Sequence, residues 1–299
     1  MIAPDLDELV ALRGAAKGLR LPSRRPTSAL HSGAHRSAHR GRGLEFQEVR
    51  PYVSGDDPRT IDWRVTARRG RPHTKLFRDE RERPVWLLAD LNATMFFGTR
   101  RQLKSSVVIR AAALLAWSAA LGGDRVGAVV AATKSYRIIP TRAREAGVLP
   151  VLATLLEMQP TAPSAPSSES LSAGLQALAP LVHPGSLVLA LSDFAALDSS
   201  ATAAWAALAV HSDVRLFWIT DPLESRGLPD GRFQIGLPGR SISVDGASTR
   251  AAWTQQWRER EAKIEELARH TAAPVIRLET SEPVEESLRT VLSGRRTAA

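Results

Sequence analysis

The chain has 299 residues, no cysteine and a formal net charge of +9. Without a thiol, it cannot form disulfide bonds, zinc–thiolate sites or a cysteine nucleophile. Its length is enough to bury a full core in one large domain or two smaller ones. The positive charge is dispersed among acids and only 5% of residues are aromatic, so the composition does not favour a nucleic-acid-binding track.

The N-terminus and the apolar stretches bear on localisation. Residues 1–9 are acidic, where a secretory signal peptide would be basic and then apolar. The longest apolar stretch, residues 107–121, contains Arg110 and is shorter than the ~20 residues that span a bilayer. We therefore interpret it as a buried helix and expect a soluble, cytoplasmic protein with no membrane span.

The first 43 residues predict a short helix and then a flexible loop. Apolar side chains recur at helical spacing between residues 4 and 19. Residues 22–43 are rich in Ser, Arg, His and Gly, which is typical of a mobile segment. His31, His35 and His39 would share one face of a helix and suggest a metal site, but the glycines among them favour a solvated loop.

Residues 44–83 combine extended segments, turns and dense opposite charge. Residues 44–49 and 74–77 predict strands, residues 54–58 a turn and residues 61–63 the start of a short helix. Arginine can bind a carboxylate through two parallel hydrogen bonds, which fixes geometry. We expect an ion-pair network that stabilises a loop-rich subdomain, with a catalytic use of the same charges as the alternative: Arg50, Asp56, Asp57, Arg59, Asp62 and Arg68.

Residues 85–89 form an apolar run that is too short for a helix, so they predict a strand buried on both faces of a parallel sheet. Asp90, Asn92 and Thr94 follow at alternating positions. In open α/β sheets, ligands bind beyond the carboxyl ends of the strands, and three hard oxygens there suggest Mg²⁺. A capped turn is the alternative, because these residue types also cap helices and turns.

The stretch from residue 43 to this strand carries a dense set of signature residues: Gly43, Glu45, Phe46, Arg50, Tyr52, Gly55, Asp56, Asp57, Arg59, Ile61, Asp62, Trp63, Ala67, Arg68, Lys75, Phe77 and Glu80. With these residues the stretch resembles the bacterial and archaeal "domain of unknown function 58" family. The resemblance implies an α/β, von Willebrand factor A-like fold: an open, mostly parallel sheet flanked by helices, with an N-terminal loop-rich/β subdomain. It also implies a partnership with MoxR-type AAA+ ATPases.

The rest of the chain mostly alternates predicted strands and helices. Helices are expected at 100–122, 142–158, 169–181, 201–210, 251–270 and 284–292, and strands at 125–132, 135–139, 186–192, 214–220 and 274–278. Residues 159–168 predict a Pro/Ser loop, and 222–249 a β-hairpin insertion. The expected organisation is therefore 1–43 helix and loop, 44–83 signature subdomain, and 84–293 von Willebrand factor A-like domain.

The second fully apolar strand, residues 186–192, also ends in an acid, Asp193. The metal site of the von Willebrand factor A-like fold gathers a first Asp-x-Ser-x-Ser loop, a threonine from a later loop and an Asp after a later strand. By this resemblance, Asp90 and Asp193 match the two acids.

The remaining positions depart from the family's metal site. Asn92 and Thr94 stand at the two serine positions, and the bulkier Asn92 would crowd an ion. Ser168, or Ser170, stands in place of the later threonine and is also a candidate helix cap. The site is thus expected to be either a weak Mg²⁺ or Mn²⁺ site or one that has lost its metal.

Three functions remain open. The first is a non-enzymatic adaptor that works with a MoxR-type AAA+ ATPase. It would use the face of the domain that carries the expected metal-site loops. The second is a metal-dependent hydrolase, a phosphatase or nuclease, that uses the two strand-end aspartates. The chain has no phosphate-binding glycine loop and no Ser/His/Asp spacing in the required context, which disfavours it. The third is a basic surface that docks on membrane lipid or on an acidic protein.

Overall fold

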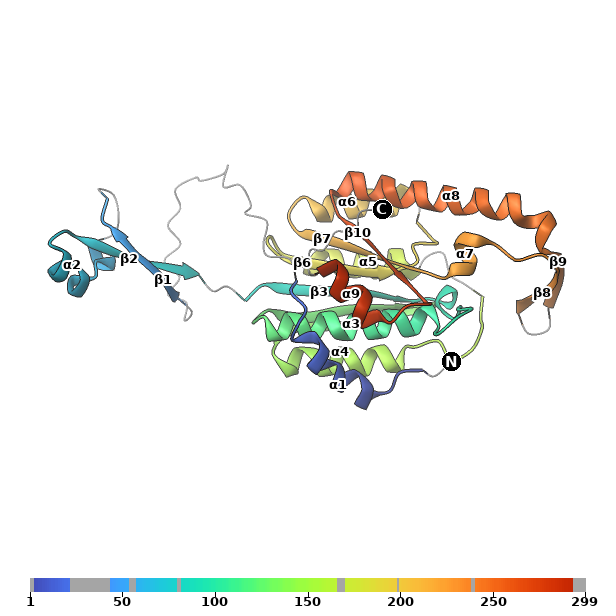
Figure 1. Ribbon diagram of the computed structural model, residues 1–299, viewed down its shortest axis with the longest axis horizontal. Coiled ribbons are helices and arrows are strands. Elements are labelled where there is room, and N and C mark those ends of the chain that lie inside the picture. The colour runs from blue at the N-terminus through green and yellow to red at the C-terminus, as the bar shows by residue number, and fades with distance from the viewer. Residues whose placement is uncertain are drawn as a thin grey trace. The chain divides into compact units, whose positions relative to one another are not determined.

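The computed structural model describes residues 3–21, 44–53, 58–79, 82–165, 170–197, 199–237 and 240–292 (Figure 1). The chain divides into two compact units, residues 28–82 and residues 1–27 with 83–299. Several sequence predictions lie outside the described residues: the loop at 22–43 with His31, His35 and His39, the turn at 54–57 with Asp56 and Asp57, and Ser168.

The smaller unit contains an antiparallel pair of strands and a short helix. Strand β1 (Leu44–Pro51) pairs with β2 (His73–Asp79), and a 3₁₀ turn, η1 (Pro58–Thr60), precedes α2 (Trp63–Arg69). The carboxylate of Asp62 accepts hydrogen bonds from the backbone N–H groups of Arg64 and Val65, which begins α2. The strands and the helix predicted from the sequence are confirmed.

The larger unit is built on a six-stranded sheet with the order β10-β7-β6-β3-β4-β5. Five strands are parallel, and β5 pairs antiparallel with β4. This confirms the predicted α/β class with a mostly parallel sheet. The strands are β3 (Pro84–Leu91), β4 (Arg125–Ala132), β5 (Ser135–Ala143), β6 (Leu187–Ser192), β7 (Asp213–Thr220) and β10 (Val275–Glu279).

Helices cover both faces of this sheet because the side chains of a strand alternate between faces. Leu87 of β3 packs into one apolar cluster and its neighbour Leu88 into the other. The first cluster includes helices α1 (Leu6–Ala16), α3 (Lys104–Leu121), α4 (Glu145–Glu157) and α9 (Val284–Leu292). The second includes α5 (Ser170–Leu178), α6 (Ser199–Ala209) and α8 (Gly246–Thr271).

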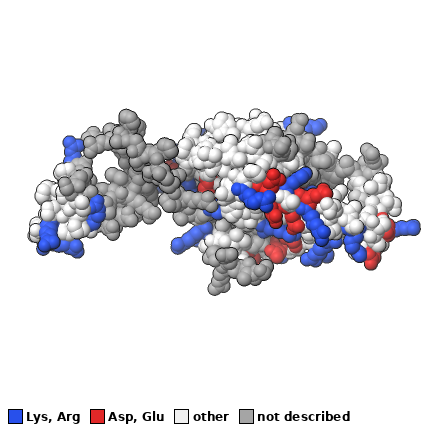
Figure 2. Space-filling model, turned by 90° about the horizontal axis from the view of Figure 1, so that it is seen from above, with Lys and Arg blue, Asp and Glu red and all other residues white. Residues whose placement is uncertain are grey.

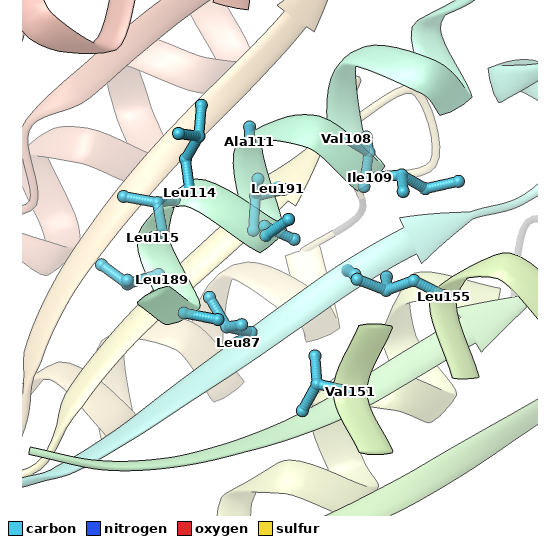
Figure 3. Close-up of a cluster of buried hydrophobic side chains, with 14 of the residues drawn as sticks. Leu87, Val108, Ile109, Ala111, Leu114, Leu115, Val151, Leu155, Leu189 and Leu191 are labelled. Carbon is cyan, nitrogen blue, oxygen red and sulfur yellow. The ribbon is translucent and has the colours of Figure 1, made fainter. Parts of the chain in front are cut away.

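Helix α3 is the core helix of the first cluster. Figure 3 shows its side chains Leu114 and Leu115 above the strand residues Leu189 and Leu87, in the same apolar cluster. By length and composition it is the one described helix that could cross a membrane, yet 83% of it is buried inside the protein. The burial agrees with the sequence interpretation of residues 107–121 as a core helix.

Some boundaries differ from the sequence predictions. The hairpin of β8 (Arg232–Leu237) and β9 (Arg240–Asp245) is confirmed, but residues 222–226 before it form helix α7 (Pro222–Arg226). Helix α8 begins at Gly246 rather than at residue 251, because the carboxylate of Asp245 caps it by accepting from the N–H of Ser248.

Candidate functional site

The carboxyl ends of β3 and β6 meet because the two strands are parallel neighbours. Strand β3 continues through Asp90 to Leu91, so Asp90 lies inside the strand rather than just after it. Its Oδ2 accepts a hydrogen bond of 2.7 Å from the hydroxyl of Ser192, the last residue of β6. This hydrogen bond connects the carboxyl end of β3, which carries Asp90, to the carboxyl end of β6, which precedes Asp193.

Asp90 is 3% exposed. Burial, and then the nearby negative charge of Asp193, raise the pKa of Asp90 to about 7. Hydrogen bonds from Ser192 and from the backbone N–H of Asn92 oppose the rise without cancelling it. Asp90 therefore holds its proton far more tightly than an ordinary aspartic acid.

Asn92 and Thr94 follow in a capped 3₁₀ turn, η2 (Ala93–Met95). The side-chain oxygen of Asn92 accepts a 2.7 Å hydrogen bond from the N–H of Ala93, which realises the capped-turn alternative. The hydroxyl of Thr94 is buried and has no hydrogen-bond partner among the described residues. The hydroxyl of Ser170 at the start of α5 is likewise buried and has no hydrogen-bond partner among the described residues.

Lys104 belongs to the site, although the sequence predictions did not place it there. Its Nζ lies 2.7 Å from Oδ2 of Asp193 and 2.9 Å from Oε1 of Glu224, and its side chain is 2% exposed. Lys104 is also the first residue of α3, where the helix dipole disfavours a positive charge. A lone lysine at the start of an apolar helix is the sequence signal that could have revealed it.

The charges of Lys104 and Asp193 stabilise each other. Burial alone would lower the pKa of Lys104, but the carboxylates of Asp193 and Glu224 outweigh it, so the pKa is raised. Burial alone would raise the pKa of Asp193, but the ammonium of Lys104 outweighs it, so this pKa is lowered. Both groups are therefore ionised in the folded protein near neutral pH.

Glu224 is held in place by the short helix α7. Its Oε2 accepts from the backbone N–H of Asp221, and the carboxylate of Asp221 accepts in return from the N–H of Leu223. Oε1 of Glu224 also receives a hydrogen bond of 3.1 Å from Arg260 of α8. Glu224 therefore links the start of α3 to α8 through two cations.

These groups lie in a cavity of about 510 Å³ between the strand ends, α7 and α8. The indole N–H of Trp253 donates to the backbone oxygen of Glu224 and fixes one wall. The cavity thus combines aromatic side chains, called its walls below, with the paired charges of Lys104, Asp193, Glu224 and Arg260, called its floor. It is lined by Ala93, Thr94, Phe96, Phe97, Lys104, Pro163, Ser164, Asp193, Glu224, Gly236, Trp253, Gln256, Trp257 and Arg260.

The predicted signature residues of the smaller unit are placed only in part. Arg59 lies in η1 and Arg68 in the last turn of α2, while Nη1 of Arg50 donates to the backbone oxygen of Pro51. Asp62 caps α2, as described above. An ion-pair network through Asp56 and Asp57 stays a prediction, since both lie outside the described residues.

Comparisons with known proteins agree with the signature. The model of the family described as "Protein of unknown function DUF58" matches residues 48–263. Uncharacterized proteins of Mycobacterium bovis and Mycobacterium tuberculosis are 28% identical over 100% of this chain and 94% of their own length.

Solved structures with some similarity come from Bacteroides. A conserved hypothetical protein BatB from Bacteroides thetaiotaomicron matches with a TM-score of 0.45 and 15% identity over 71% of this chain and 97% of its own. An aerotolerance-related membrane protein from Bacteroides fragilis matches with a TM-score of 0.46 and 15% identity, over 71% of this chain and 96% of its own.

Proposed function

Because the chain belongs to the DUF58 family, we propose that it is a non-enzymatic protein-interaction module that works as an adaptor of a MoxR-type AAA+ ATPase. In this proposal, a partner docks at the cavity on the carboxyl edge of the sheet. The observation that carries the proposal is the composition of that cavity, which combines aromatic side chains with mutually paired charges.

The walls suit protein recognition. Phe96, Phe97 and Trp253 line the cavity, and aromatic side chains supply much of the binding energy at protein interfaces. A partner side chain that enters the cavity would bury apolar surface against them. The floor is already organised by ion pairs, so little ordering is needed when a partner arrives.

The floor is poorly suited to catalysis. A hydrolytic base must take a proton at the cavity, but Asp90 is not among the residues that line the cavity, and both of its carboxylate oxygens accept hydrogen bonds. Lys104 does line it, but it is charged and is held between Asp193 and Glu224. Both oxygens of Asp193 also accept hydrogen bonds, one from Lys104 and one from the N–H of Ala195. These contacts support an interaction role over the hydrolase alternative.

The surface charge supports a protein partner over a lipid surface. Figure 2 shows Lys and Arg side chains interspersed with Asp and Glu on the face that carries α8. A docking site for anionic lipid would favour a cluster of one sign. A mixed surface matches a partner that is itself mixed in charge.

The test uses Gln256, an exposed residue of α8 that lines the cavity. We expect a purified MoxR-type ATPase from the same genome to bind the wild-type chain. The substitution Gln256→Trp should fill the cavity mouth and weaken binding at least about tenfold, equivalent to about 1.4 kcal/mol. The matched control is Gln255→Trp, one position away on the same exposed helix, and it should bind as wild type. Isothermal titration calorimetry would give both affinities.

Two results would count against the proposal, and they differ in meaning. If no MoxR-type ATPase of that genome binds, the partner class is wrong. If the ATPase binds the wild type and the Gln256→Trp variant equally well, the docking surface is elsewhere on the chain.

A further inference from the structure

Lys104 lies beside Asp193, one of the two acids that match the metal site of the von Willebrand factor A-like fold. We infer that its ammonium group takes the place of the divalent cation, so that the carboxyl edge of this sheet carries a built-in positive charge and does not bind Mg²⁺. This inference does not depend on the proposed partner.

The carboxylate oxygens expected to bind a metal all accept hydrogen bonds within the protein. Oδ1 of Asp90 accepts from the N–H of Asn92, and Oδ2 accepts from the hydroxyl of Ser192. Oδ2 of Asp193 accepts from Lys104, and Oδ1 accepts from the N–H of Ala195. A metal ion at these carboxylates would have to share each oxygen with its present donor or displace that donor.

The charge of the cluster argues in the same direction. Lys104 and Arg260 bring two positive charges, which balance the negative charges of Asp193 and Glu224. A divalent cation at Asp193 would sit next to the ammonium group in a buried environment, where repulsion between like charges is strong. The residues present therefore do not fit Mg²⁺ while Lys104 is charged.

The hydroxyl of Thr94 shows what the same cavity could do without the lysine. Thr94 lines the same cavity as Asp193 and Glu224, and its hydroxyl oxygen is buried with no hydrogen-bond partner among the described residues. Two carboxylates and a hydroxyl are hard oxygen ligands of the kind that Mg²⁺ and Mn²⁺ prefer. Removing the ammonium should therefore turn the cluster into a metal site.

The experiment compares the melting temperature of the full chain in EDTA, Mg²⁺ and Mn²⁺. A ligand that binds only the folded state raises its stability. We expect no metal-dependent shift for the wild type, and a clear upward shift with Mg²⁺ or Mn²⁺ for Lys104→Met. The double variant Lys104→Met/Asp193→Asn should lose the shift. Lys134→Met removes an exposed lysine and should behave as wild type.

The inference is overturned by either of two results. One is a metal-dependent shift in the wild type that Asp193→Asn abolishes. The other is a folded Lys104→Met variant that gains no shift with either metal. Should Lys104→Met fail to fold, Mn²⁺ binding to the wild type, measured by electron paramagnetic resonance, decides. Absence of site-bound Mn²⁺ supports the inference, and binding that Asp193→Asn removes overturns it.

Discussion

Lys104 and Asp193 form an ion pair in which each side chain is only 2% exposed. Lys104 is the first residue of α3, and Asp193 directly follows β6. The pair therefore joins a helix to the carboxyl edge of the sheet. Removing one partner of such a pair leaves the other charge buried without compensation, which is costly.

We predict that Lys104→Met lowers the free energy of unfolding by about 3–5 kcal/mol in metal-free buffer. The variant Lys104→Met/Asp193→Asn should recover part of this loss, because it removes one of the two stranded carboxylates. Urea denaturation followed by circular dichroism would measure both. The control Lys134→Met should stay within about 0.5 kcal/mol of the wild type. Equal effects of Lys104→Met and Lys134→Met would refute a structural role of the pair.

Asp90 should make stability depend on pH with an unusual sign. Its pKa is raised to about 7 in the folded protein, against about 3.9 in the unfolded chain. As pH rises between these values, the unfolded chain loses this proton first, so Asp90 reduces stability by at most about 1.4 kcal/mol per pH unit.

The variant Asp90→Asn isolates this effect. Its free energy of unfolding minus that of the wild type should increase between about pH 5 and about pH 8, because the variant has no proton to release there. Urea titrations at several pH values would measure the difference. A difference that does not change over this range would show that Asp90 has an ordinary pKa.

Asp221 should contribute stability of the opposite pH dependence. Burial alone would raise its pKa, but hydrogen bonds from Thr280 and Thr99 outweigh it, so the pKa is lowered. Such a group stabilises the fold above the unfolded pKa of about 3.9, and this contribution is lost as pH falls through the folded pKa.

We expect Asp221→Asn to lower the free energy of unfolding by about 1.5–3 kcal/mol at neutral pH, the usual worth of a hydrogen bond to a charged group. The difference from the wild type should shrink below about pH 4. Asp230→Asn is the control, because the Asp230 carboxylate is 76% exposed and surface ion pairs contribute little. If both substitutions destabilise equally, the Asp221 contacts are not specific.

Substitution of Gly174 should lower the stability of the protein, because α5 packs closely on the sheet at this residue. A Cβ at this position would lie 3.0 Å from Cβ of Ala131 and 3.1 Å from Cδ1 of Leu88. We predict that Gly174→Ala destabilises the protein by about 1–3 kcal/mol through overpacking. Gly14 of α1 has nothing within 4 Å of its Cβ position, so Gly14→Ala should stabilise by about 0.5–1 kcal/mol. Thermal denaturation distinguishes the two, and a stabilised Gly174→Ala variant would contradict the packing.

Elements with a strong local pattern were predictable. The apolar runs of β3 and β6 identify strands because they have the length of a strand, are too short for a typical helix and are bounded by turn residues. The start of α8 was not predictable, because the cap at Asp245 lies within residues that also end the hairpin. A boundary of this kind depends on which of two local preferences the tertiary fold selects.

The position of α1 also needed the structure. Its periodicity predicts a helix, but nothing local shows that the indole N–H of Trp117 donates to the backbone oxygen of Leu9 and thereby joins α1 to α3. Packing partners are set by contacts between distant segments, and a single sequence does not display them.

The sequence by itself determined the family, the parallel α/β class and the two strand-end acids, Asp90 and Asp193, because these depend on short motifs and local periodicity. Only the tertiary structure decided what those acids do. Lys104 is 89 residues from Asp193 and 120 from Glu224 along the chain. Lys104, the cation that pairs with Asp193 and Glu224, therefore reaches them only in the folded chain. The physical reason is that a buried charge is stable only where folding brings its partners to it.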